Sequence, residues 1–288
     1  MNDSKENNSK RKNKILSPKM DIVFQVLFGE VGSEEITKSF LETVLGRKIK
    51  KVDLSRNPIL RRINTNDKMG ILDVIVQVDD DEICNIEMQV AKRDDIIQKI
   101  LYYWARTYVR NIHKNEEYKT LNKTIGIIIT DFKINELKSL GYFTKWKIIE
   151  TNERKVILTD YFELDIIEIP KIYDNITNKS DKLLDWICFL DNPTSGKVED
   201  IMESNEGIRK AKEKLEELSD DEIMQRLAEW KEAAEHDEAS ARGTAMREGI
   251  AKEKKEIASK MLEKGIKIEL IKEITGLTDK ELTELINK

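Results

Sequence analysis

Hydrophobic and polar residues alternate along two neighbouring stretches of the chain. Every second position is apolar, first at Leu72, Val74, Val76 and Val78, and then at Cys84, Ile86, Met88 and Val90. Strict alternation is typical of β-strands that bury one face. The acidic triplet 79–81 separates the two stretches and has the length of a three-residue hairpin loop. The pattern therefore predicts a β-hairpin.

The predicted hairpin brings two acidic residues together. A three-residue loop pairs Val78 with Glu82. In that register Asp73 lies directly opposite Glu87, and both point away from the valines. Opposed side chains in an antiparallel pair lie about 5 Å apart at Cβ, and like charges there are destabilising. A cation, a shared proton or an Arg or Lys must offset the repulsion. Because Gln89 returns to the same face, the arrangement predicts a site for a hard cation.

Further helices and strands surround the hairpin. Apolar spacings of three and four residues predict helices over 19–29, 33–45, 94–113 and 181–190, the first two ending at Gly29 and Gly46. Apolar runs predict strands near 52–54, 124–129, 142–150 and 164–169. The run 124–129 is apolar on both faces, which is typical of a central strand. Strands on both sides of a long helix predict an α/β domain.

The helix predicted at 94–113 has two different faces. Its apolar stripe consists of Ile97, Ile100, Leu101, Trp104, Tyr108 and Ile112. The other side carries several cations, and there Tyr102 and Arg106 share a face because they are four residues apart. A cationic helix face that follows an acidic strand is suited to position a phosphate backbone. Lys99, Arg106 and Tyr102 are the candidate contacts.

Composition divides the chain into three parts. Residues 1–14 are almost wholly polar and are expected to form a disordered tail, residues 15–195 carry the α/β pattern, and residues 196–288 are expected to form a helical arm. Two short helices around Gly276 end the arm and have the outline of a helix-turn-helix. The acidic Glu281 and Glu284 make the second helix a poor reader of a DNA groove, so packing against the arm or a second subunit is the favoured interpretation. The arm has few apolar residues to bury, which predicts a homo-oligomer through these helices.

Composition also limits the classes of protein. Charged residues make up 36% of the 288 residues, yet the net charge is -5, so any contact with DNA should come from a local basic patch. Cys84 and Cys188 match no disulfide framework or metal-ligand spacing, which fits a reducing cytoplasm. No apolar run approaches the ~18 residues of a membrane span, and no classical signal peptide opens the chain. We therefore expect a soluble cytoplasmic protein with no membrane contact.

The hairpin residues also resemble a known family. The pattern D-K-x-x-x-L-D-V ending at Val74, followed by N-I-E-M-Q at 85–89, is similar to the PD-(D/E)XK nuclease superfamily. Within it, the chain resembles the recombination-promoting nuclease (Rpn) family, also described as PD-(D/E)XK nuclease transposases. The resemblance extends upstream to 16–24 and 27–29, and downstream to 102–103, 117–118 and the strand ending at 131–132. Leu72 replaces the proline of the superfamily name, and Gln89 replaces its lysine.

The resemblance implies a restriction-endonuclease-like core, a central mixed sheet flanked by helices. It also implies a DNA endonuclease that uses Mg²⁺, with Mn²⁺ as an expected substitute. Asp73, Glu87 and the backbone carbonyl of Met88 would bind the metal, and Gln89 would orient water or a phosphate oxygen. Asp21 would be a third acidic residue, and Lys68 or Lys99 would supply the missing cation.

Simpler explanations also account for the acidic residues and for the fold. Asp21 also suits the positive end of a helix dipole, whereas Asp73 and Glu87 also suit solvent-facing positions of a half-exposed sheet. The alternative function is that of a catalytically silent module for DNA binding or oligomeric assembly. An intact acidic pair argues against loss of catalysis.

Overall fold

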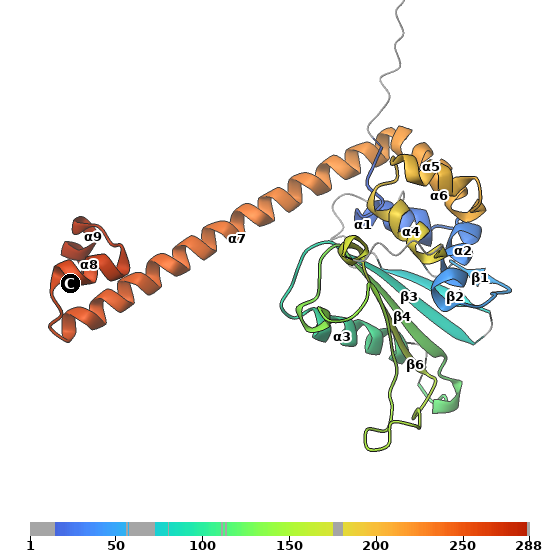
Figure 1. Cartoon of the computed structure of the whole chain (residues 1–288), viewed down its shortest axis with the longest axis horizontal. Coiled ribbons are helices and arrows are strands. Elements are labelled where there is room, and N and C mark those ends of the chain that lie inside the picture. The colour runs from blue at the N-terminus through green and yellow to red at the C-terminus, as the bar shows by residue number, and fades with distance from the viewer. Residues whose placement is uncertain are drawn as a thin grey trace, which may run out of the picture. The chain divides into compact units, whose positions relative to one another are not determined.

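The alternating and apolar stretches form one six-stranded mixed sheet (Figure 1). The structure, a computed structural model, describes residues 15–55, 57, 73–79, 81–110, 112, 114–174 and 181–286. The predicted tail 1–14, Lys68 and Leu72 lie outside the described residues. The strand order is β1 (Val52–Asp53), β2 (Val74–Val78), β3 (Glu82–Gln89), β4 (Lys123–Thr130), β6 (Phe162–Glu168) and β5 (Phe143–Trp146). This sheet, flanked by helices, confirms the predicted α/β class.

The central strands combine both directions of pairing. β2 is antiparallel to β1 and β3, β4 is parallel to β3 and β6, and β5 is antiparallel to β6. The turn between β2 and β3 has the predicted three residues, and Asp79 adopts a φ of 49° there. The Asp79 carboxylate accepts the backbone N–H groups of Lys50 and Lys51. The acidic turn is therefore held against the segment before β1.

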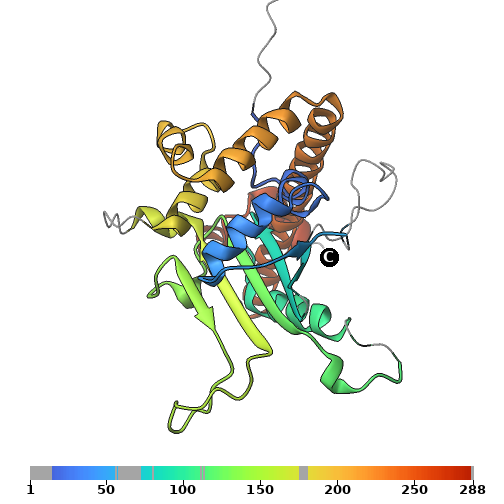
Figure 2. The ribbon, with the colours of Figure 1, turned by 90° about the vertical axis from the view of Figure 1, so that its right-hand side faces the viewer.

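Helices cover the two faces of the sheet unequally. On one face, α1 (Asp21–Gly29), α2 (Glu34–Leu45) and α4 (Lys182–Asp191) share a core with Val74, Ile86 and Ile127. In Figure 2 the blue helix α2 lies in front of the strands on this face. On the other face, α3 (Ile96–Val109) packs on Ile128 and Leu164. β3 is consequently buried on both faces.

The first helix differs from its predicted amphipathic pattern. Every residue from Ile22 to Gly29 is buried, because α1 lies between β2, α2 and α6 (Glu206–Asp220). Its ring-to-ring contact between Phe24 and Phe28 continues to Phe40 of α2. α1 is therefore a core helix that presents only its first residue, Asp21, toward the surface.

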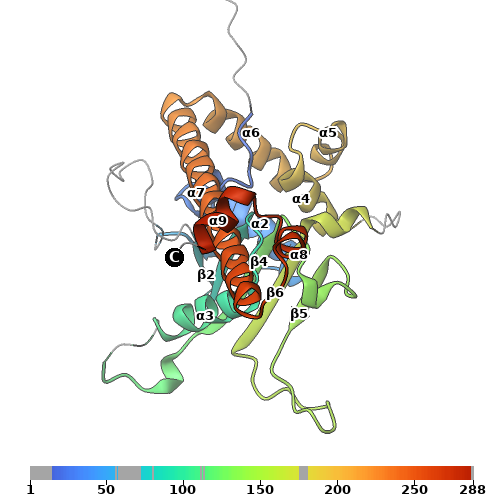
Figure 3. The same cartoon turned by 90° about the vertical axis from the view of Figure 1, so that its left-hand side faces the viewer.

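The strand predicted at 142–150 is shorter in the structure. β5 ends at Trp146, and the following residues leave β6 and pair with one another through a bridge between Ile149 and Ile157. Figure 3 shows this connection between β5 and β6 extending beyond the sheet. The apolar residues that suggested one long strand thus belong to two pieces of structure.

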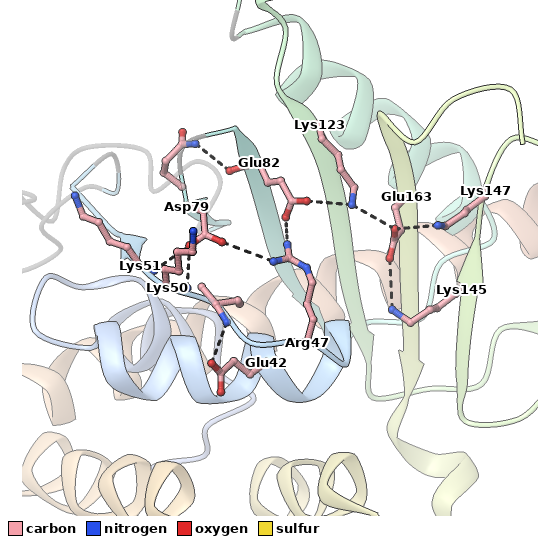
Figure 4. A network of polar contacts seen from close by, with 12 residues as sticks. Glu42, Arg47, Lys50, Lys51, Asp79, Glu82, Lys123, Lys145, Lys147 and Glu163 are labelled. Carbon is pink, nitrogen blue, oxygen red and sulfur yellow. Dashed lines mark hydrogen bonds and ion pairs between the residues drawn. The ribbon is translucent and has the colours of Figure 1, made fainter.

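A chain of ion pairs crosses the sheet near the starts of β3, β4 and β6 (Figure 4). Glu82 binds Arg47, which follows α2, and lies 3.2 Å from the Nζ atom of Lys123. Glu163 lies 3.9 Å from the same Nζ atom and 3.4 Å from that of Lys145 on β5. Individual pairs of this kind contribute little, but together they connect four strands at the end opposite the Gln89 end of β3.

Two helices beyond residue 195 belong to the core. α5 (Gly196–Met202) and α6 bury Val198, Ile208 and Leu215 against the helices of the first face. The first compact unit accordingly runs to Ala228, past the end at residue 195 that composition suggested. Helical structure in this segment was predicted, but its packing into the core was not.

The second compact unit covers residues 229–288. It contains most of α7 (Glu222–Glu263), followed by α8 (Ile268–Thr275) and α9 (Asp279–Ile286). Ile271 and Leu282 of the two short helices pack on Ala258 of α7. Thr278 and Glu281 form a capping box before α9, since each accepts the backbone N–H of the other. Among the described residues, no helix has the length and apolarity to cross a membrane.

The close contact between α2 and α6 gives the first prediction. A Cβ atom at Gly207 would lie 2.5 Å from the Ser39 Cβ atom, which the backbone of α2 fixes in place. Gly207→Ala should therefore lower the free energy of unfolding by about 1–3 kcal/mol in urea denaturation. Gly196→Ala is the matched control, because nothing lies within 4 Å of its added Cβ, and it should change the value by less than about 0.5 kcal/mol. Equal stabilities of the two variants would contradict the packing of α6 into the core.

Candidate active site

The register of the β2–β3 hairpin brings the predicted acidic pair together. Val78 pairs with Glu82 and Val74 pairs with Ile86, as the turn length predicted. Asp73 immediately precedes β2, so one further step in the same register places it opposite Glu87. The repulsion between the two carboxylates contributes to the raised pKa of Asp73. The register predicted from the turn length is therefore confirmed, while the chemical role of the pair stays a prediction.

The pair opens into a cavity of about 200 Å³. Its walls come from the start of α1, the entry to β2, the end of β3 and the first turns of α3. The lining residues are Asp21, Phe24, Asp73, Glu87, Met88, Gln89, Lys99 and Tyr103. Six residues singled out in the sequence thus meet in one cavity, although they come from four elements.

Burial dominates the electrostatics of the pair. Glu87 is 6% exposed because α3 covers its face of β3, so it is not the solvent-facing strand residue of the simpler explanation. Burial, followed by the charge of Glu87, raises the pKa of Asp73 to about 7. Burial also raises the pKa of Glu87, although Lys99 acts in the opposite direction. Both carboxylates are thus less stable as anions than they would be in water.

Lys99 partly offsets this negative charge. Its Nζ atom lies 3.3 Å from Glu87 Oε1 and donates a hydrogen bond to Gln89 Oε1. The amide nitrogen of Gln89 donates to Glu87 Oε1. Glu87, Gln89 and Lys99 therefore form a closed polar group in which the helix α3 supplies the cation missing from the end of β3.

Tyr102 and Arg106, the other candidate DNA contacts, lie outside the cavity. Tyr102 is 62% exposed and does not line the cavity. Arg106 does not line it either, although its charge lowers the pKa of Asp73. Their contacts with DNA stay predictions. Lys68, the other candidate cation, lies outside the described residues.

Two residues of the cavity, Phe24 and Tyr103, lie in stretches that carry the family resemblance but were not predicted as site residues. Tyr103 lies below Lys99, whose Nζ atom is 5.5 Å from the ring centroid. The four-residue spacing of Lys99 and Tyr103 on one helix was a usable signal, but Tyr102 and Arg106 have the same spacing. Phe24 gives no such signal, since its apolar side chain fits the core of α1 equally well.

The donor atoms suit a hard divalent cation. Among the residues that the structure describes, no three His, Cys, Asp or Glu side chains form a group that could hold a metal by themselves. A cation between Asp73 and Glu87 would need backbone, amide or water oxygens to complete its shell. Mg²⁺ fits this requirement because it keeps several waters and takes few protein carboxylates. The buried Glu87 and the half-buried Asp73, both with raised pKa values, are also a pair that a cation would stabilise.

Comparison with protein families gives two matches. Residues 18–245 match the PD-(D/E)XK nuclease family transposase. Residues 251–286 match the C-terminal HTH domain of the Rpn/YhgA-like nuclease family. Neither the curated proteins nor the solved structures give a match. The second match identifies the end of α7 with α8 and α9 as a helix-turn-helix domain, so the outline seen in the sequence was informative despite its acidic second helix.

The raised pKa of Asp73 gives a prediction for the metal-free protein. The folded state holds this proton up to about pH 7, whereas the unfolded chain releases it near pH 4, so the stability it contributes is lost as the pH rises through 7. In EDTA, Asp73→Asn should therefore be about 1–3 kcal/mol more stable than the wild type at pH 8, and this gain should shrink toward pH 5. Chemical denaturation of both proteins across this range measures the difference. A gain that does not depend on pH, or a loss at pH 8, would contradict the burial of an ionised Asp73.

Proposed function

Because the chain belongs to the PD-(D/E)XK nuclease family of transposases, we propose that it is a metal-dependent DNA endonuclease associated with recombination or transposition. The observation that carries the proposal is the opposed pair Asp73 and Glu87, which line a polar cavity with Lys99 beside them. The active site of the proposed enzyme is this cavity. DNA is the proposed substrate, and the cytoplasm is the proposed location.

Asp73 and Glu87 would hold Mg²⁺, with the backbone carbonyl of Met88 as a further ligand. Mn²⁺ should replace it, because it accepts the same oxygen donors. When bound, the cation supplies charge neutralisation at the phosphate and a water of lowered pKa. Binding would also remove the cost of burying two carboxylates side by side.

Lys99 and Gln89 would act on the substrate side of the cavity. The ammonium of Lys99 would provide a positive charge beside the phosphodiester as negative charge develops on it. Gln89 is held between Glu87 and Lys99, so its amide can orient water or a phosphate oxygen. A neutral amide cannot stabilise an anion as a lysine does, which is why the cation from α3 matters. Asp21, on the cavity wall, would accept a hydrogen bond from water.

The C-terminal unit would contribute to DNA binding. Its match to a helix-turn-helix domain supports a second DNA contact, remote in sequence from the cavity. A homo-oligomer through the C-terminal helices stays a prediction. Leu270 and Ile274 support it, because they lie one turn apart on α8 and are 46% and 59% exposed.

Lys99 and Arg106 should have separable roles. Lys99→Gln should lower kcat for DNA cleavage by about 10²–10³-fold with little change in KM, because it removes charge next to the reacting phosphate. Arg106→Gln, on the same helix but outside the cavity, should raise KM and reduce its dependence on salt while kcat changes little. Steady-state cleavage of a labelled duplex at several salt concentrations measures both. An effect of Lys99→Gln on KM alone would make Lys99 a DNA contact and not part of the catalytic group.

The proposed activity is tested by cleavage of supercoiled plasmid. Wild-type protein should nick or linearise the plasmid with Mg²⁺ or Mn²⁺, and not with EDTA. Asp73→Ala should lose this activity while keeping the far-ultraviolet circular dichroism of the wild type. No cleavage by folded wild-type protein that still shifts DNA would instead indicate a silent binding or assembly module. Equal cleavage by both proteins would mean a contaminant or another active site.

A further inference from the structure

The segment before α1 is fixed at both of its ends. Residues 15–20 form no helix or strand, although they lead directly to Asp21 at the cavity. At one end the backbone N–H of Leu16 donates to the buried hydroxyl of Ser219 on α6. At the other end Lys19, with a side chain 19% exposed, lies among carboxylates from two distant parts of the chain. The position of Asp21 therefore depends on contacts outside its own helix.

Lys19 bridges the ends of two elements. Its Nζ atom lies 3.0 Å from Asp131 Oδ1 and 3.0 Å from Asp191 Oδ1. Asp131 directly follows β4, whereas Asp191 is the last residue of α4. Asp191 also accepts a hydrogen bond from the hydroxyl of Tyr173, which ends the 3₁₀-helix η4 (Ile169–Tyr173). One ammonium thus connects the start of α1 with the ends of a central strand and a core helix.

The contact with Asp131 leads directly to the candidate site. The backbone N–H of Asp131 donates to the carbonyl of Gln89, 2.9 Å away, and so continues the pairing of β3 with β4. Lys19 is consequently connected to the last residue of the acidic strand through a single intermediate residue. It does not itself line the cavity, so a direct contact with substrate is not its role.

We propose that Lys19 is a positioning residue that holds Asp21 against the Gln89 end of β3 and so fixes the geometry of the cavity. This proposal rests on the proposed function. An ammonium between two carboxylates, itself only 19% exposed, restricts motion of the segment 15–20 more than a solvent-exposed pair would. Removing a side chain that supports a metal site without touching the metal commonly lowers metal affinity or activity by about 10–100-fold.

The experiment is a titration of the full chain with Mn²⁺, without DNA, followed by electron paramagnetic resonance. Lys19→Met should weaken Mn²⁺ binding about tenfold and lower kcat for cleavage by a similar factor, with KM for DNA unchanged. Lys19→Arg keeps the positive charge between Asp131 and Asp191 and should restore most of the affinity. Asp131→Asn, which removes the negative charge at the strand end and leaves Asp191 in place, should weaken Mn²⁺ binding in the same direction. This variant also serves if Lys19→Met does not fold.

The matched control is Lys133→Met. Lys133 follows Asp131 by two residues and pairs with Asp174 on the surface, where its side chain is 47% exposed. Its removal should leave Mn²⁺ binding as in the wild type. Folded Lys19→Met or Asp131→Asn protein with wild-type affinity for Mn²⁺ would overturn the positioning role, as would an equal loss in Lys133→Met.

Asp73→Asn in the same titration distinguishes this inference from the proposed function. If Asp73→Asn binds Mn²⁺ as well as the wild type does, the proposed metal site is wrong, and the positioning role is wrong with it. If Asp73→Asn fails to bind while Lys19→Met binds normally, only the positioning role is overturned. Loss of affinity in both variants, with recovery in Lys19→Arg, supports both.

Discussion

The candidate site is organised around the electrostatic repulsion between the carboxylates of Asp73 and Glu87. The three-residue turn fixes the register of β2 and β3, and that register places the two carboxylates opposite each other. Glu87 is 6% exposed, so water solvates its carboxylate less well than that of a surface residue. Lys99 offsets only part of the negative charge, because burial, followed by the charge of Glu87, still raises the pKa of Asp73, and burial still raises the pKa of Glu87. A bound cation would neutralise the rest, and metal-dependent hydrolysis of a phosphodiester uses a cation in this way.

The remainder of the first compact unit holds the two carboxylates opposite each other. A slip of β3 by one residue would move every one of its side chains to the opposite face of the sheet. The packing of β3 on both faces therefore fixes its register and keeps Asp73 opposite Glu87. α1 is buried on every side and presents Asp21 to the cavity from its first turn. The ion pairs across the starts of β3, β4 and β6 connect the strands at their opposite ends. The site is therefore supported by the rigid part of the domain.

How much the sequence predicts depends on the range of the interaction concerned. The hairpin, its turn and the opposition of Asp73 and Glu87 follow from a period of two and a loop of three residues, which are local properties. The burial of Glu87 and the choice of Tyr103 over Tyr102 depend on how α3 docks, and local spacing does not encode the docking angle. The packing of α6 into the core was missed for a related reason. Its stripe of Ile208, Ala211, Leu215 and Leu218 is narrow among many charged residues, so the composition resembled a solvated arm. In each case the missing information was tertiary.

The account is tested most directly by locating a metal ion. Crystals soaked in Mn²⁺ should give one anomalous diffraction peak within coordination distance of the carboxylates of Asp73 and Glu87. In the same crystals Lys99 should no longer contact Glu87, whether or not it keeps its hydrogen bond to Gln89. The peak should be absent from crystals of Glu87→Gln. A wild-type structure with no peak between the two carboxylates, and with Lys99 still bound to Glu87 at saturating Mn²⁺, would contradict the central claim. The lysine, and not a metal, would then be the group that resolves the opposition of the acidic pair.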